Sequence, residues 1–195
     1  NILQAAQRHG RAIAIEYDIT GASPEKFFGL MRDDWKYLVT ELKVTSHPCY
    51  LHHRGKPVLS VWGMGLAESR HVPRDPETAL RVVKWFKEDA PPELRVTYVG
   101  GVPARWRTLS KDAMKESGWR EVYARMDVIQ PWSVGRYTNG AGADQWRQEI
   151  IEPDLLQQWG GEIPKGRTAL AGADDVCAFE DQDANLPFRT GQFAW

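Results

Sequence analysis

An alternation of short apolar runs with helix-type segments is the feature that most constrains the fold of this chain. Four runs have the composition of buried strands: residues 11–18, 57–62, 95–99 and 127–131. They recur at intervals of about 35 to 45 residues, with a helical pattern between neighbours. Parallel strands need such spacing, because a crossover helix must return the chain to the starting edge of the sheet. The sequence therefore predicts an α/β fold of parallel βαβ units.

Local signals predict where other elements begin. Helices are expected from residues 33–34, from residues 75–77 and from Asp144, where acidic residues can cap a first turn, and a shorter helix is expected over residues 119–125. Residues 54–56 predict the turn of a hairpin that leads into the second strand.

The glycines after the second strand bear on the choice between α/β folds. Gly63-Met64-Gly65 lacks the third glycine and the downstream acid of a dinucleotide fingerprint, which disfavours a Rossmann fold. A (β/α)8 TIM barrel commonly takes about 250 residues. With 195 residues and four clear units, the chain is expected to form a barrel that is short, incomplete or truncated. Residues 1–195 are then a single catalytic-type barrel domain that lacks the first and last strands.

Composition excludes several classes of protein. Hydrophobic residues make up 42% and charged residues 26%, which is typical of a globular chain. The net charge is -1 without a basic stripe, so no nucleic-acid partner is expected. No apolar run reaches the roughly 20 residues of a membrane span, so no membrane partner is expected.

The segment ending at Gly10 has no signal-peptide pattern and predicts a chain that begins within a domain. The compartment and the oligomeric state stay open. Cys49 and Cys177 match no metal or redox spacing, and either a disulfide or two buried thiols is compatible with them.

Three tryptophans follow the predicted strands at their C-terminal ends. In (β/α)8 barrels the working residues follow the C-terminal ends of the strands. Trp62, Trp106 and Trp132 come there, beside glycines, and are expected to line a cleft in which indoles stack on sugars. Residues that can bind sugar hydroxyls lie nearby or in the hairpin: Tyr17, His52, Arg107, Arg136 and Tyr137. Ion pairing for the arginines and core packing for Tyr137 are the alternatives. The tryptophans on helical faces are expected to pack in the core: Trp35, Trp85, Trp119, Trp146 and Trp159.

Two carboxylates are candidates for catalysis. Glycoside hydrolysis generally uses a pair of carboxyl groups that flank the scissile bond. Asp18 ends the first strand, and Glu16 lies two residues earlier, on the same face of a regular strand. Capping of the next loop is the alternative role of Asp18, and pairing with an arginine is that of Glu16. Asp127 begins its strand, at the stabilising end of a barrel, and is discounted.

No metal and no cofactor is expected. His52 and His53 are adjacent, so they point to opposite faces of a strand, and no acid or cysteine completes a ligand set with them. Ser133 lacks the Gly-x-Ser-x-Gly context of a serine hydrolase.

Three sequence runs resemble one family. YLHHRGKPVLSVWGMG, YVGGVPARWR and DVIQPWSVGRY, in this order, resemble bacterial and fungal proteins related to glycoside hydrolase families 71 and 99, called xylosidase/arabinosidase-like. The resemblance covers about residues 10–153, with a weaker echo in residues 186–195. It implies a (β/α)8 fold and hydrolysis of glycosidic bonds in oligo- or polysaccharides, as in endo-acting mannosidases and fungal glucanases.

The last part of the sequence departs from the pattern of this family. Family 99 enzymes take their catalytic acids from an acidic turn after a late strand, which the resemblance places beyond Trp195, and residues 168–185 do not read as an apolar strand. A fragment or a degenerate paralogue fits this pattern. The sequence therefore predicts a glycoside hydrolase, or alternatively a carbohydrate-binding relative without the acid pair. An aldolase-like barrel would require a Schiff-base lysine or a metal cluster at a strand end. Sugar, linkage and stereochemical outcome are left open.

Overall fold

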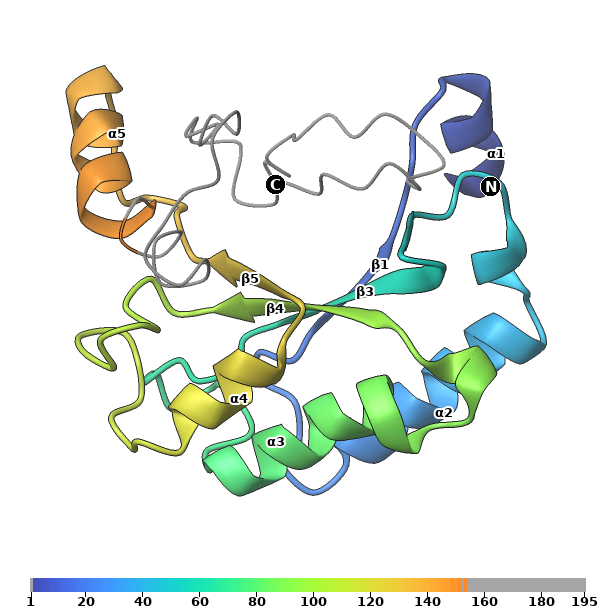
Figure 1. Ribbon diagram of the computed structural model, residues 1–195, viewed down its shortest axis with the longest axis horizontal. Helices are drawn as coiled ribbons and strands as arrows, with labels where there is room; N and C mark the ends of the chain where they lie inside the picture. The colour runs from blue at the N-terminus through green and yellow to red at the C-terminus, as the bar shows by residue number, and fades with distance from the viewer. Residues whose placement is uncertain (1, 152, 154–195) are drawn as a thin grey trace.

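The computed structural model describes residues 2–151 and 153 and has a parallel sheet at its centre. The strand order is β1-β3-β4-β5, as Figure 1 shows. A short strand, β2, pairs antiparallel with the start of β3 and forms the expected hairpin. The α/β fold of parallel units is thereby confirmed. The strands are β1 (Ile15–Asp18), β2 (His52–His53), β3 (Lys56–Trp62), β4 (Thr97–Val102) and β5 (Val128–Pro131).

Helices connect the parallel strands and lie together on one face of the sheet. These are α2 (Phe27–Thr40), α3 (Pro76–Lys84) and α4 (Trp119–Arg125), below the sheet in Figure 1. Neighbouring strands follow one another in sequence, and crossovers of one hand then place every helix on the same side. This winding differs from the doubly wound order of dinucleotide-binding sheets. The remaining elements are α1 (Ile2–Arg8), α5 (Gly140–Trp146), the π-helical segments Trp85–Asp89 and Arg147–Ile151, and the 3-10 turns Val44–Ser46 and Pro92–Leu94.

The start of α2 is determined by the apolar residues that it buries and not by the acidic residues 33–34. Residues 33–34 lie inside α2, which begins at Phe27, so the predicted start is wrong. Phe27, Met31 and Trp35 are spaced by four residues and form one buried face, which extends the helix upstream of the acids. Asp75 does cap α3, because its carboxylate accepts a hydrogen bond of 2.7 Å from the backbone N–H of Thr78.

A second helix also begins earlier in the chain than predicted. We expected Asp144 to begin a helix, but α5 begins at Gly140. The side chain of Asn139 caps it and accepts a hydrogen bond of 2.9 Å from the N–H of Gly142. The amide of an asparagine serves as a cap as well as a carboxylate does, and this one comes five residues earlier.

The main core lies between the sheet and its helices. Trp35 and Trp119 are fully buried in it, and Trp85 packs against it partly buried, which confirms the core expectation for these three. The indole N–H of Trp35 donates a 2.9 Å hydrogen bond to the carbonyl of Leu94 and thereby ties α2 to the turn before β4. Trp159 lies outside the described residues.

The amino edge of the sheet is held by ionic contacts. The Asp127 carboxylate accepts a hydrogen bond of 2.8 Å from the N–H of Tyr98 and pairs at 2.8 Å with the ammonium of Lys87. This geometry agrees with a stabilising role for Asp127. At the same end Cys49 is buried, and Cys177 lies outside the described residues. Within the described part of the chain, no helix is long and apolar enough to cross a membrane.

Candidate functional site

The predicted pair of carboxylates shares the sheet face opposite to α2, α3 and α4. Ile15 and Tyr17 of β1 pack toward the helices, so the alternating Glu16 and Asp18 point to the other face. Their Cα atoms are about 7 Å apart in a regular strand. The hydroxyl of Ser60, the register partner of Glu16 on β3, donates a 2.7 Å hydrogen bond to the Glu16 carboxylate. The partner of Glu16 is therefore a serine, where the sequence suggested an arginine.

Asp18 stands at the tip of β1 and also holds the loop that follows. One of its carboxylate oxygens accepts a 2.9 Å hydrogen bond from the backbone N–H of Thr20. The loop-capping role foreseen as an alternative is therefore present. In the parallel register Asp18 aligns with Trp62, so the carboxylate and the indole are neighbours on one face.

A stacked pair of tryptophans lies at the carboxyl edge of this face. The rings of Trp62 and Trp132 have centroids 4.7 Å apart and planes inclined by 29°. Both side chains are partly buried. Gly101 aligns with Trp62 in β4, and a Cβ there would come within 2.0 Å of the Trp62 ring. The glycine thus lets the indole of Trp62 approach the backbone of β4 closely. The backbone N–H of Trp132 donates a 3.0 Å hydrogen bond to the carbonyl of Val102, which holds the backbone of this residue beside β4.

The structure corrects the expected position of Trp106. Its side chain is 7% exposed and contacts Tyr123 edge to face, with ring centroids 5.9 Å apart. The loop turns directly after β4, since the backbone N–H of Trp106 donates a 3.2 Å hydrogen bond to the carbonyl of Pro103. The indole packs into the core. Trp106 is therefore not a cleft wall. Arg107 is partly buried, and its carbonyl accepts a 3.0 Å hydrogen bond from Arg120.

Two other candidates lie away from the carboxyl edge. His52 is in β2, beside Pro57 near the amino end of β3, and its Nδ1 lies 3.0 Å from the carbonyl of Tyr50. Tyr17 packs on the helix side of the sheet, and its hydroxyl donates a 2.7 Å hydrogen bond to Asp34. Burial, and then this contact with Asp34, raises the pKa of Tyr17. Neither residue is grouped with the stacked tryptophans, because strand polarity and side-chain alternation place them elsewhere.

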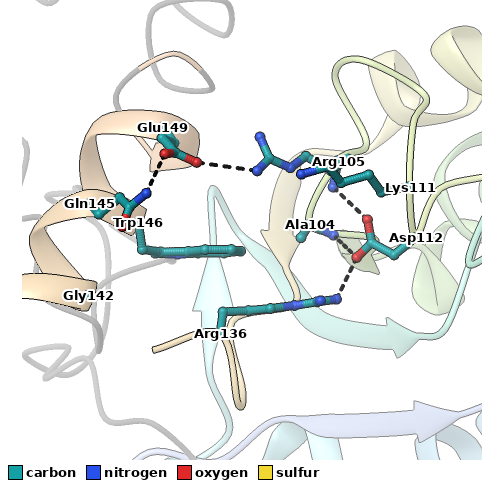
Figure 2. Close-up of a pocket in the computed structure, with 9 residues that line it drawn as sticks. All are labelled: Ala104, Arg105, Lys111, Asp112, Arg136, Gly142, Gln145, Trp146 and Glu149. Atoms are coloured by element: carbon teal, nitrogen blue, oxygen red, sulfur yellow. Dashed lines mark hydrogen bonds and ion pairs between the residues drawn. The ribbon is translucent and has the colours of Figure 1, made fainter. Parts of the chain in front are cut away.

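Beyond the ends of β4 and β5, the loops, α5 and the segment Arg147–Ile151 line an open cavity of about 330 Å³, shown in Figure 2. Of the predicted site residues, Arg136 lines it. Trp146, expected in the core, is partly buried and also lines it, which corrects that expectation. Tyr137 supports this wall, with its ring centroid 6.5 Å from that of Trp146. The lining residues are Ala104, Arg105, Lys111, Asp112, Arg136, Gly142, Gln145, Trp146 and Glu149.

Asp112 organises one side of this cavity. Its carboxylate accepts hydrogen bonds from the backbone N–H groups of Ala104, at 2.9 Å, and Arg105, at 3.1 Å. It also pairs with the guanidinium of Arg136 at 2.8 Å. Across the cavity, Glu149 accepts a 2.8 Å hydrogen bond from the amide of Gln145 and lies 3.4 Å from Arg105. The Gln145 hydrogen bond, with a further contribution from Arg105, lowers the pKa of Glu149.

His71 braces the loops that follow β1 and β3. It is 4% exposed, and its Nδ1 lies 3.3 Å from the hydroxyl of Thr20. Burial lowers the pKa of His71 below its ordinary value of 6.5, against the opposing effect of Glu68, whose carboxylate lies 3.8 Å from Nε2. The folded chain therefore binds fewer protons here than the unfolded chain does. Stability consequently rises with pH across this window.

This linkage gives a measurable pH dependence. The contribution of neutral His71 is present above the unfolded pKa and is lost as pH falls through about 6.5 toward the lower folded pKa. We expect the Tm to fall between about pH 7.5 and pH 5.5, and His71→Gln to have a flatter Tm profile over this range. Calorimetry of both chains measures it. Parallel profiles would show that His71 does not titrate differently on folding.

Comparisons of the chain with protein-family models, with curated proteins and with solved structures found no match. The structure itself shows an α/β protein whose parallel sheet has its connecting helices on one face. Asp18, a stacked tryptophan pair and a charged cavity lie at its carboxyl edge, and Glu16 lies within β1 on the same face as Asp18. Within the described part of the chain, no group of three or more histidine, cysteine or acidic side chains has the geometry of a metal site.

Proposed function

We propose that this protein binds carbohydrate along the carboxyl edge of its parallel sheet and hydrolyses glycosidic bonds there. One observation carries the proposal: the stacked indoles of Trp62 and Trp132 lie on the same sheet face as Glu16 and Asp18. Flat aromatic surface beside a few polar groups is typical of a site that orients a ligand with both apolar and hydroxyl-bearing faces. A sugar ring has both.

The winding of the sheet supports this proposal. Consecutive parallel strands with all their helices on one face are the arrangement of successive units in a (β/α)8 barrel. We propose that the four described units belong to such a barrel. Active sites of (β/α)8 enzymes lie at the carboxyl ends of the strands, which is where the two tryptophans and Asp18 are found.

The proposed chemistry uses the two carboxylates in different roles. One protonates the glycosidic oxygen, while the other activates water or attacks the anomeric carbon. The Ser60 hydroxyl positions Glu16, and the Thr20 backbone positions Asp18, so both groups have a fixed orientation. The loops after β4 and β5 would hold the sugar units on either side of the bond that is cleaved.

A second candidate function is carbohydrate binding without hydrolysis. The hydrogen bond from the Thr20 N–H to Asp18 favours it, because a carboxylate that caps a loop has a structural reason to be there without catalysis. In that case the Trp62 and Trp132 pair remains a sugar platform, and substitution of Asp18 alters the loop alone.

Titration with oligosaccharides tests the binding part of the proposal. Trp62→Ala and Trp132→Ala are each expected to weaken binding about tenfold, because about 50 Å² of apolar ring surface covered by a sugar contributes about 1.3 kcal/mol. Isothermal titration of the full chain with neutral manno-, gluco- and xylo-oligosaccharides measures the change. Tyr37→Ala is the control, since Tyr37 is an aromatic on α2 that is 52% exposed.

A backbone variant tests the same site without removal of a ring. Gly101→Ala forces the Trp62 indole off the sheet, because the added Cβ would overlap it, and is expected to weaken binding as Trp62→Ala does. Gly29→Ala is the matched control, since nothing lies within 4 Å of a Cβ at that helical position. Unchanged affinity in Gly101→Ala and in both tryptophan variants would place the sugar elsewhere.

A further inference from the structure

We propose that the cavity beyond β4 and β5 is a subsite for a negatively charged sugar unit, one that carries a carboxylate or a sulfate group. This inference rests on the proposed function and names the substrate class that the site selects. It starts from the charges in the lining: the three cations Arg105, Lys111 and Arg136 face the two acids Asp112 and Glu149. One positive charge is in excess in this lining.

The two arginines are held in place before any ligand arrives. Arg136 is fixed by Asp112, which two backbone N–H groups anchor in turn, and Arg105 is oriented by Glu149. A guanidinium has five donors in a planar fork, so one contact to an acid leaves other N–H groups available for an oxyanion. Fixed donors also lose little entropy when they bind.

Lys111 supplies the excess charge. It has a left-handed backbone conformation with φ of 53°, and its side chain is exposed at the cavity. The ammonium lies near enough to Glu149 to contribute to its lowered pKa, but the ion pairs of the cavity are Asp112 with Arg136 and Glu149 with Arg105. The Lys111 charge can therefore meet a carboxylate or a sulfate without the loss of one of these ion pairs.

Trp146 adds a flat apolar surface beside these cations. Its indole projects from α5 into the cavity in Figure 2, and the Arg136 side chain lies below it in this view. An aromatic face together with guanidinium donors suits a ring that is apolar on its face and anionic at its edge. At about 330 Å³ the cavity is at the small end of ligand pockets, which start at about 300 Å³.

The chain links the tryptophan pair to the cavity at two places. The backbone N–H of Trp132 bonds the carbonyl of Val102, and Ala104, two residues after Val102, lines the cavity. Arg136 lines it four residues after Trp132. The proposal therefore has an oligosaccharide on the stacked pair extend its next unit toward the cavity.

Binding of matched oligosaccharides tests this inference. The full chain is titrated with trigalacturonate, a sulfated galactose trisaccharide, neutral galactotriose and inorganic sulfate. We expect both anionic sugars to bind about tenfold more tightly than the neutral one at low salt, and this preference to shrink at high salt. Lys111→Asn, which keeps a residue tolerant of left-handed φ, and Trp146→Ala should each reduce the anionic affinity about fivefold. Lys115→Gln, an exposed lysine of the same loop outside the cavity lining, should have no effect.

The outcomes separate the two proposals. Equal affinity for neutral and anionic sugars, or a preference that survives Lys111→Asn and Trp146→Ala, overturns the subsite and leaves the carbohydrate cleft standing. Inorganic sulfate that binds as tightly as the anionic sugars overturns the assignment to a sugar. An affinity for the anionic sugars that Lys111→Asn reduces and Trp132→Ala leaves unchanged supports the cavity and counts against the tryptophan pair as a sugar platform. A preference for only one of the two anionic sugars identifies which oxyanion the cavity takes.

Discussion

Glu16→Gln and Asp18→Asn are each expected to reduce the hydrolysis of glycosidic bonds by about 100-fold to 10,000-fold, because each removes a group that transfers a proton or forms a bond in the transition state. Both substitutions preserve shape and hydrogen-bond acceptance, so the contacts with Ser60 and Thr20 can persist. The release of reducing ends from oligosaccharides by the full chain, followed over time, measures the loss.

Two controls sharpen this prediction. Glu93→Gln changes an exposed acid near the amino edge and should leave the rate unchanged. Ser60→Ala removes the hydroxyl that positions Glu16, and we expect a smaller loss than that of Glu16→Gln. Full activity in both carboxylate variants would exclude Glu16 and Asp18 as the catalytic pair. Binding without hydrolysis in the unmodified chain would favour the second candidate function.

Trp35→Ala is expected to destabilise the fold by about 3 to 5 kcal/mol. The indole is fully buried between α2 and the sheet, and its truncation leaves a cavity that close-packed neighbours fill only in part. It also leaves the Leu94 carbonyl without the 2.9 Å hydrogen bond from the indole. Urea denaturation followed by far-UV circular dichroism gives the free energy of unfolding.

Tyr37→Ala is the control for this measurement. It removes an aromatic ring from the same helix at a position that is 52% exposed, where truncation forms no cavity, and should change stability by less than about 0.5 kcal/mol. Similar losses in Trp35→Ala and Tyr37→Ala would show that the contact of α2 with the sheet does not depend on the buried indole.

Much of the fold could be predicted from periodicity, because the spacing of strands is a property of the chain alone. The apolar runs marked the four parallel strands to within a few residues, and the Asp75 cap was read from adjacent residues. Helix α2 shows the limit of local signals. Its start depends on which residues face the sheet, and burial of Phe27 and Met31 outweighs the acids at residues 33–34.

The site was predicted less completely because loops determine it. The positions of Trp62 and Trp132 at the carboxyl edge could be predicted because both residues adjoin strand ends, whose direction follows from the sheet. Trp106 lies in a loop that turns back to the core, and neither Trp146 nor Asp112 adjoins a strand. Strand periodicity contains no information about the path of such loops. Two arginines close together after β4, Arg105 and Arg107, are the one sequence feature that indicates a charged loop at this place.

The most direct test of the carbohydrate cleft is an NMR titration that observes each indole N–H. The full chain, with ¹⁵N-labelled tryptophan and signals assigned by single substitutions, is titrated with neutral and anionic oligosaccharides. Saturable shifts of the Trp62 and Trp132 signals, with the fully buried Trp35 and Trp119 unmoved, are the result we predict. Binding that leaves the Trp62 and Trp132 signals unchanged, or no binding of any oligosaccharide, would contradict the proposed carbohydrate site at the carboxyl edge of the sheet.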